Sequence, residues 1–320
     1  MLIFARNIKK NTNKMKDAKE PVVILIVLFI LMGFAYGPLK KAKENGSSQN
    51  ASSIGTKTVT DNKDVAENIK DIKEGVKDLG KDLTQMIEES KRSPYYDKIR
   101  MSNISGLQGN DPGREYMTLS TNLKKGESVK ITGWYLKSEV TGYYAAIGKA
   151  AFLPFPFTKT ESDVILQRGD KVYLTKGFSP IGISFRTNKC TGYFEENRTF
   201  VPSLSLQCPR PKDESLPQFS SNLDRDDECI DIIKRIPRCR TKDSEFIRDL
   251  PDTVSQTCKN YITEQINYNS CVSKHLGDPD FPGNEYRIYL GKFGPLWRKQ
   301  REKINLHDQN GLIVDTIEIK

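Results

Sequence analysis

The chain has 320 residues, which allows one or two domains of ordinary size, and it carries a net charge of +9. The excess lies at the N-terminus: residues 1–56 contain nine Lys or Arg against three Asp or Glu, whereas residues 93–320 contain 33 against 29. The globular part is therefore nearly balanced, and the basic pI is weak support for a DNA-binding surface.

An uncharged run of nineteen residues, Pro21 to Leu39, follows a basic tail at residues 1–20. At about 1.5 Å per helical residue it is about 28 Å long, enough to cross a bilayer core. A cleaved signal peptide and a buried helix are the alternatives, but the run has no small-x-small exit site and no polar face. We expect an uncleaved transmembrane helix at 21–39, with a cytoplasmic N-terminus and an extracytoplasmic C-terminal domain, because Lys and Arg are more numerous before the run.

Residues 40–60 are small and polar and are typical of a flexible linker. Apolar residues then recur from Val65 to Met86 at alternating steps of four and three. This spacing is that of a coiled-coil seam, and so narrow a stripe favours self-association over packing on a globular core. We expect a coiled-coil stalk at 61–92 and a weak parallel homo-oligomer through 65–86; the alternative is one amphipathic helix lying on the domain or the membrane.

After Pro94, aromatic and β-branched residues become frequent and turn residues recur regularly. Several short strands separated by such turns are typical of a β-sandwich or barrel, so the expected fold class is mainly β. Alternating apolar residues predict single strands, a strand pair and a closing hairpin, at 115–121, 128–136, 162–175, 285–291 and 303–320.

These strands carry four motifs: an opening Glu-Tyr strand, a Gly-Trp-x-Leu strand, an Arg-Gly strand pair and an Asp-x-x-Gly hairpin. In this chain they are, in the same order, Glu115-Tyr116, Gly133-Trp134-Tyr135-Leu136, Arg168-Gly169, and Asp308-Gln309-Asn310-Gly311 with Val314-Asp315. In them the chain resembles the lamin-tail family, most of all its membrane-anchored bacterial members. The resemblance implies an immunoglobulin-like β-sandwich. The family-motif positions expected in its core are Tyr116, Trp134, Leu136 and Gly311, with Trp134 between the sheets.

The closing motifs come about 80 residues after the earlier ones. We therefore expect the sandwich at 94–204 plus 283–320 and an insertion at 205–282. Within the insertion the apolar period lengthens to that of helices, one over 222–239 with acids first and bases last, and one over 255–275.

All six cysteines lie beyond the apolar run, within 82 residues: Cys190, Cys208, Cys229, Cys239, Cys258 and Cys271. An even count outside a membrane predicts three disulfides; zinc is the alternative, but no Cys-x-x-Cys pair occurs. Two antiparallel helices favour the nested pairs Cys229–Cys271 and Cys239–Cys258, which leaves Cys190–Cys208. Fifteen connectivities are possible, so this pairing is only a geometric preference.

The sequence contains no G-x-S-x-G, H-E-x-x-H, P-loop or G-x-G-x-x-G motif, and neither His275 nor His307 lies in a catalytic pattern. We expect no enzymatic activity and no cofactor. The acidic run at 224–228 could hold Ca²⁺, but a helix N-terminus explains it more simply, so no metal site is expected.

Two long apolar segments, 141–159 and 178–194, read as loops of the sandwich. Aromatic loops on a rigid scaffold are common binding sites, although burial in the core is the commoner fate of such residues. The candidate binding aromatics are Tyr143, Tyr144, Phe155, Phe157 and Phe185.

Together these features predict a non-enzymatic, single-pass protein of the bacterial cell envelope that displays the lamin-tail-like domain to bind a surface protein or polysaccharide. The alternative is an envelope nucleic-acid-binding protein that assists DNA handling or uptake, since some bacterial members of the family are associated with nucleases and basic residues cluster at 234–242 and 297–303. An unrecognised hydrolase is the second alternative.

Overall fold

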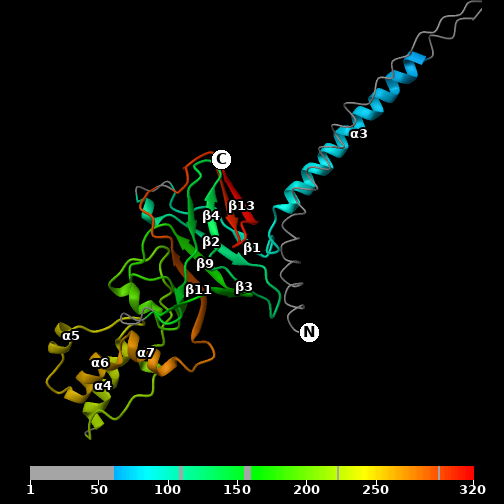
Figure 1. The fold of residues 1–320 in the computed structure, drawn as a ribbon. Helices are drawn as coiled ribbons and strands as arrows, with labels where there is room; N and C mark the ends of the chain where they lie inside the picture. Colours follow the sequence, from blue (N-terminus) through cyan, green and yellow to red (C-terminus); the bar gives the residue numbers. More distant parts are fainter. Residues whose placement is uncertain (1–60, 108–110, 155–159, 222, 295) are drawn as a thin grey trace, which may run out of the picture. The chain divides into compact units, whose positions relative to one another are not determined.

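A computed structural model describes residues 61–107, 111–154, 160–221, 223–294 and 296–320 (Figure 1). The chain divides into two units, residues 1–71 and 72–320. The predicted cytoplasmic tail, transmembrane helix and linker all lie outside the described residues. Among the residues that are described, no helix is long and apolar enough to cross a membrane.

The segment predicted as a stalk forms one helix, α3 (Asp61–Ser90). Six of its seven seam residues have described side chains, and all six are 49–70% exposed: Ile69, Ile72, Val76, Leu79, Leu83 and Met86. The helical prediction is confirmed, and no other part of the described chain buries these side chains. The coiled coil itself stays a prediction.

Beyond α3, the strands of the described chain form three sheets. The seven-stranded sheet has the order β1 (Ile99–Met101), β2 (Tyr116–Thr121), β9 (Lys171–Thr175), β11 (Pro282–Tyr289), β10 (Phe185–Asn188), β6 (Ala150–Ala151), β7 (Glu161–Ser162). The four-stranded sheet has the order β13 (Ile313–Ile319), β12 (Glu302–His307), β4 (Tyr135–Ser138), β5 (Tyr144–Ala146). A short pair joins β3 (Ser128–Lys130) to β8 (Ile165–Gln167).

One hydrophobic core is shared by all three sheets. Met117 of β2, Leu166 of β8 and Leu306 of β12 contribute to it, and each is fully buried. Trp134 is also fully buried there, as predicted. Leu306 lies opposite Leu136 in the β12–β4 ladder, so the end of the chain completes the sheet that follows Trp134. The sheet-rich fold class is thereby confirmed.

Two strand predictions need correction. The strand predicted at 128–136 is broken, because Gly133 has a φ of +88°, which places β3 and β4 in different sheets. The predicted pair within 162–175 is not a hairpin: β8 pairs with β3, whereas β9 pairs with β2 and β11. In both cases the alternating pattern identified strand residues but not their partners.

The closing hairpin agrees with the prediction. β12 and β13 pair antiparallel around a turn in which Gly311 has a φ of +82°. The Asp308 carboxylate accepts hydrogen bonds from Asn310 N at 2.8 Å and Leu312 N at 3.0 Å, which fixes that turn. Ser93 Oγ donates to the same carboxylate, at 2.7 Å, so the hairpin also anchors the chain that follows α3.

The insertion contains four helices rather than two: α4 (Leu223–Arg235), α5 (Ser244–Arg248), α6 (Gln256–Gln265) and α7 (Tyr268–His275). The helix predicted over 255–275 stops at Ile266. Asn267 then caps a new helix by accepting a hydrogen bond from Ser270 N at 2.9 Å. Three short 3₁₀ turns complete the chain: η1 (Pro112–Arg114), η2 (Thr191–Glu196) and η3 (Pro211–Asp213).

All six cysteines form disulfides, as predicted, but the predicted pairing is wrong. The bonds are Cys190–Cys271, Cys208–Cys239 and Cys229–Cys258. The nested pairing assumed one straight helix over 255–275. Because the chain turns at Asn267, Cys271 instead joins a second core with Cys190, Cys208 and Cys239, which packs with Phe185 of β10. Only Cys229–Cys258 lies in the third core, between α4 and α6.

The second core also moves the expected boundary of the insertion. Phe200 and Leu204, which precede residue 205, pack with Tyr268 and Val272 of α7. Arg287 of β11 is buried beneath this segment and donates hydrogen bonds to the carbonyls of Pro202 and Ser203. The inserted segment is therefore attached to the seven-stranded sheet by packing in the second core, by the Cys190–Cys271 disulfide and by the hydrogen bonds of Arg287 (Figure 1).

Candidate functional site

A cleft of about 440 Å³ opens where β9 and β11 end. This volume lies within the range of small-molecule sites. Its lining residues come from four segments of the chain: Asp111, Gly113, Arg114, Thr175, Gly177, Phe178, Pro180, Thr199, Val201, Tyr289 and Phe293.

The parallel pairing of β9 with β11 explains why the cleft forms there. Parallel strands end at the same edge, so the chain after Thr175 and the chain after Tyr289 leave the sheet together. The two segments stay joined beyond the strands, because Leu290 N donates to Thr175 O at 2.8 Å and Lys292 N donates to Lys176 O at 2.9 Å. The cleft walls are thus continuous with the sheet.

Gly177 permits the third segment to close the wall. A Cβ at this position would collide with the carbonyl oxygen of Gly113, so any other residue would push the two segments apart. Gly113 lies in η1, the short helix that ends one residue before β2. The contact between these two glycines therefore sets the spacing of the cleft wall.

A buried ion pair supports the walls from below. Lys176 Nζ lies 3.0 Å from Glu115 Oε2, and both side chains are almost fully buried. Trp297 Nε1 donates to the same carboxylate oxygen at 2.8 Å. Because Glu115 follows η1, Lys176 follows β9 and Trp297 lies beyond β11, this network holds the bases of three segments in one arrangement.

Two phenylalanines form the lip of the cleft. The ring centroids of Phe178 and Phe293 lie 4.3 Å apart with planes inclined at 32°. Phe178 is 53% exposed and Phe293 is 83% exposed. Exposure of paired aromatic rings beside a cavity is unfavourable in isolation, since each ring could bury far more apolar surface, and such patches commonly mark a recognition surface.

Arg114 is the one positively charged side chain in the cleft lining. It makes no ion pair and donates no side-chain hydrogen bond within the described part of the chain. Asp111 lies beside it and accepts a hydrogen bond from Gly113 N at 2.9 Å through one carboxylate oxygen. The cleft therefore combines an apolar lip, an unpaired guanidinium and a carboxylate, which balance in formal charge.

Tyr289 forms part of the cleft lining and packs its ring against the second core. Its hydroxyl is buried and has no hydrogen-bond partner within the described residues. Burial raises the pKa of this phenol far above its ordinary value, and the nearby Glu195 carboxylate adds to the effect, while Arg287 opposes it. The phenol stays neutral and acts as a fixed wall.

Three of the five aromatic residues predicted for binding are described by the structure, and none of these three lines this cleft. Tyr143 and Tyr144 are exposed, at 56% and 65%, but they lie at the edge of the four-stranded sheet. Phe185 is fully buried in the second core, so its prediction as a binding residue is wrong: the segment 178–194 is not a loop but contains β10. Phe155 and Phe157 lie outside the described residues.

The four family-motif positions have different environments. Trp134 and Leu136 are buried in the first core, as expected. Tyr116 is only half-buried and packs edge-on against Tyr173, with ring centroids 6.0 Å apart. Gly311 occupies an exposed turn, where its φ of +82° is the feature that matters. Only two of the four are therefore core residues.

Both histidines make structural contacts. His275 Nε2 lies 2.9 Å from Glu214 Oε1 and its Nδ1 lies 2.8 Å from Asp278 Oδ2, so neither ring nitrogen is free to act as a general base. Burial lowers the pKa of His275, but the hydrogen bonds to the two carboxylates outweigh burial and raise it overall. His307 stacks on Tyr135, with centroids 4.8 Å apart, and its Nδ1 contacts Gly311 O.

Parts of the basic run at 234–242 and of the acidic run at 224–228 are engaged locally. Lys234 pairs with Asp231 at 2.9 Å, and Lys242 lies over the Phe246 ring. Asp226 accepts hydrogen bonds from Phe219 N and Ser220 N, which accounts for one carboxylate of the acidic run. Within the described ranges, no group of three or more His, Cys, Asp or Glu could hold a metal ion.

Sequence reasoning missed Phe178, Phe293 and Arg114. Phe178 is the first residue of the apolar segment 178–194, which was predicted to be a loop. The sequence did not show that this residue follows β9, a strand that pairs parallel with the distant β11. The available signal was a Phe beside a Gly soon after a strand, which occurs both in Lys176-Gly177-Phe178 and in Gly291-Lys292-Phe293-Gly294.

No protein-family model, curated protein or solved structure matches the chain. What the protein does is therefore inferred from the contacts of its own residues. Among the described surfaces, the cleft at the ends of β9 and β11 is the place where an apolar lip, an unpaired cation and a rigid support come together.

Proposed function

We propose that the protein is a non-catalytic binding module of the cell envelope, anchored by residues 21–39 and displaying a lamin-tail-like, immunoglobulin-like β-sandwich outside the membrane. The cleft below Phe178 and Phe293 contacts a surface protein or polysaccharide. The observation that carries the proposal is this exposed ring pair at the lip of the cleft, with ring centroids 4.3 Å apart. A rigid scaffold with an exposed aromatic lip is suited to recognition.

Three disulfides support an extracytoplasmic location for the folded part. Disulfides persist in oxidising compartments and are rare where thiols are kept reduced. The nineteen uncharged residues at 21–39, with basic residues in excess before them, support an anchor with its N-terminus inside the cell.

The exposed seam of α3 supports a parallel homo-oligomer. Its apolar side chains recur at coiled-coil spacing and are about half or more exposed in the single chain, from 49% at Ile69 to 70% at Leu79. Chains anchored in one membrane share a high local concentration, which favours even a weak association. An oligomer would present several clefts together and raise the avidity of each.

A non-catalytic role fits the contacts of the two histidines. A hydrolytic base needs a free ring nitrogen within reach of a nucleophile. Both nitrogens of His275 are bonded to carboxylates, and Nε2 of His307, which has no hydrogen-bond partner among the described residues, is buried within a hairpin. If the protein were the hydrolase considered as the second alternative, turnover would disappear in His275→Ala or His307→Ala.

The test of the proposal uses envelope material as the ligand. The purified full-length protein is incubated with isolated cell envelopes, and bound protein is measured by sedimentation. The double variant Phe178→Ala/Phe293→Ala should bind about 30-fold more weakly, as expected for loss of a central aromatic contact. Tyr144→Ala, which removes an equally exposed ring from another sheet, should bind as the unaltered protein does. Equal binding by all three would overturn the proposal.

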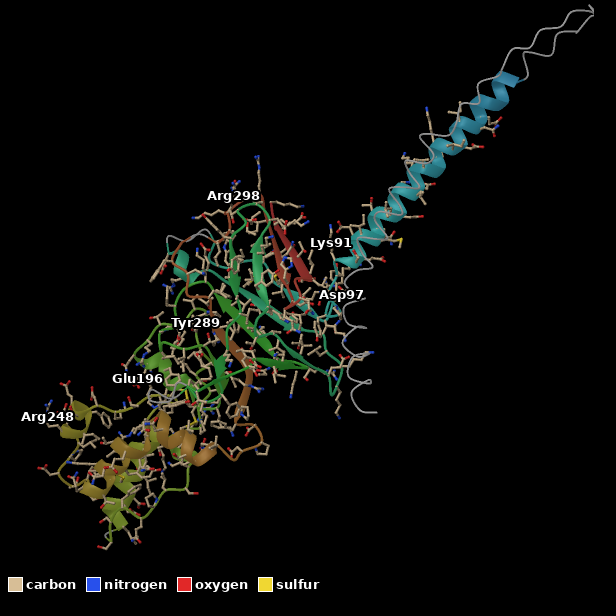
Figure 2. All side chains as sticks on the ribbon, in the orientation of Figure 1. Lys91, Asp97, Glu196, Arg248, Tyr289 and Arg298 are labelled. Atoms are coloured by element: carbon tan, nitrogen blue, oxygen red, sulfur yellow. A yellow bond between two sulfur atoms is a disulfide. The ribbon has the colours of Figure 1, made fainter. Side chains whose placement is uncertain are left out.

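The nucleic-acid alternative is supported by a different observation. Arg298, Lys299 and Arg301 are exposed, whereas the neighbouring Glu302 is buried and accepts a hydrogen bond from Ser138 Oγ at 2.9 Å. The loop therefore presents cations without exposed acids, at the end of the unit opposite Arg248 (Figure 2). Binding of single-stranded DNA that falls steeply between about 50 and 200 mM salt would favour this alternative.

A further inference from the structure

We infer that the cleft at the ends of β9 and β11 binds an acidic saccharide, whose ring lies against Phe178 and Phe293 and whose carboxylate pairs with Arg114. The inference rests on the proposed binding function and names the ligand class of that same site. Three properties support this assignment: the exposed ring faces of the lining, its unpaired guanidinium, and the position of the cleft at the ends of two strands that have neighbours on both sides in the sheet.

The lip offers a surface that suits the C–H face of a sugar. The faces of aromatic rings carry partial negative charge and attract the weakly positive hydrogens of an apolar ring face. Phe178 and Phe293 are exposed and inclined at 32°, so they present ring surface to the cleft without a hydroxyl of their own. They can cover an apolar face while the polar edge of the ligand remains free for other contacts.

The polar groups of the lining suit the edge of the same ligand. Arg114 has five N–H donors and no partner among the described residues, and a guanidinium pairs most strongly with a carboxylate in a two-bond arrangement. Asp111 uses one carboxylate oxygen to accept from Gly113 N, which leaves acceptor capacity for ligand hydroxyls. One cation, one acceptor group and an apolar lip match a uronic acid.

A peptide fits this cleft less well. Peptides that bind sheets usually add a strand to an open edge. β9 lies between β2 and β11, and β11 lies between β9 and β10, so neither strand beneath the cleft has a free edge. Arg114 and Asp111 also balance in formal charge, whereas a nucleic acid needs a groove of net positive charge along its backbone.

Binding of defined oligosaccharides tests the inference. The full-length protein is titrated with a galacturonic acid trimer and with the corresponding neutral galactose trimer, and binding is measured by calorimetry. The acidic trimer should bind at least about tenfold more tightly than the neutral one. Arg114→Gln should remove this difference, and Phe293→Ala should weaken both by about tenfold or more. Arg168→Gln, an exposed cation outside the cleft, is the matched control and should leave both unchanged.

The outcomes separate this inference from the proposed function. If neither trimer binds but cell envelopes are still retained through Phe178 and Phe293, the ligand class is wrong and the binding function stands. If an acidic peptide or a DNA oligonucleotide of matched charge binds and the trimers do not, the ligand belongs to that other class and the inference is overturned. If nothing binds and envelopes are not retained, both fail. Unaltered circular dichroism of each variant shows that the fold is intact.

Discussion

Nζ of Lys176 lies 3.0 Å from Oε2 of Glu115, and each side chain is no more than 5% exposed. The pair joins the chain after β9 to the chain before β2, and the carboxylate also accepts a hydrogen bond from Trp297. A buried charge without a partner is costly, because the protein interior solvates it far less well than water does. This contact therefore affects both the stability of the fold and the shape of the cleft.

Replacing Lys176 with Met should lower the free energy of unfolding by about 3–5 kcal/mol, since it leaves the Glu115 carboxylate buried and without its cation. Urea unfolding measures the change. The matched control is Lys98→Met, which breaks the exposed pair with Glu127 and should cost at most about 1 kcal/mol. Combining Lys176→Met with Glu115→Gln should restore part of the loss. Equal costs for the buried and the exposed pair would show that the buried pair has no special role.

The ladder between β12 and β4 predicts that the end of the chain is required for the whole fold. Leu306 is fully buried opposite Leu136. Leu306→Ala should lower the free energy of unfolding by about 2–5 kcal/mol through the cavity it leaves. Ile165→Ala is the control, because Ile165 is a β-strand residue that is 47% exposed. A small cost at Leu306 would mean that the last strands fold as a separate body.

The sequence predicted helices and strands correctly where the apolar residues of an element lie on one face. The closing hairpin and the helical stalk segment were predicted from local pattern, because alternation and heptad spacing report which side chains are apolar on one face. The buried position of Trp134 was predicted from the family resemblance. The turn at Gly311 was also predictable, because a short Asn-Gly turn needs positive φ, which glycine adopts at little cost.

The cleft and the disulfide pairing were not predictable in the same way. Both depend on which distant segments become neighbours: β11 returns parallel to β9 after the insertion, and Cys271 turns away from α6 because Asn267 starts a new helix. A polar residue that caps a helix looks, in a periodic stretch, like any exposed helical residue. Phe293 was missed because an aromatic residue beside glycines after a strand does not show which distant segment it will contact.

The disulfides give a direct covalent prediction. A non-reducing peptide map should contain the crosslinks Cys190–Cys271, Cys208–Cys239 and Cys229–Cys258. Peptides joined through Cys229 and Cys271 would contradict the arrangement of the helices.

Removing one disulfide should act locally. Cys229→Ala/Cys258→Ala should destabilise the helices by about 2–4 kcal/mol, because the bond limits the unfolded chain between α4 and α6. Since the third core is distinct from the core shared by the sheets, hydrogen exchange should rise in α4 and α6 and stay unchanged in β2 and β9. Faster exchange throughout the sheets would show that the two cores unfold as one.

The seam of α3 predicts an association that depends on two positions. Val76→Asp/Leu83→Asp places charges at two seam positions that are one heptad apart, and it should shift the full-length protein towards monomers in sedimentation velocity. Lys70→Asp/Lys77→Asp adds the same residues on the polar face and should leave the association unchanged. Identical sedimentation of both variants and the unaltered chain would exclude this seam as an interface.

The His275 contacts predict a stability that falls as the pH rises. Its pKa is raised: burial acts to lower it, but the hydrogen bonds to Glu214 and Asp278 prevail. Asp278 is ionised near neutral pH, because its contacts first with Lys189 and then with His275 lower its pKa. A raised pKa in the folded state stabilises the fold fully below the pKa of the unfolded state, and this contribution disappears as pH rises through the folded value.

The measurement compares the unaltered protein with His275→Gln by urea unfolding at about pH 5.5 and about pH 8.5, on either side of the ordinary histidine pKa. The difference in free energy of unfolding between the two proteins should be larger at the lower pH, because only charged His275 attracts both carboxylates. Other titrating groups are common to both proteins and largely cancel. A difference that grew with pH would mean that the imidazole binds Glu214 and Asp278 chiefly in its neutral form, as a hydrogen-bonding group rather than as a cation.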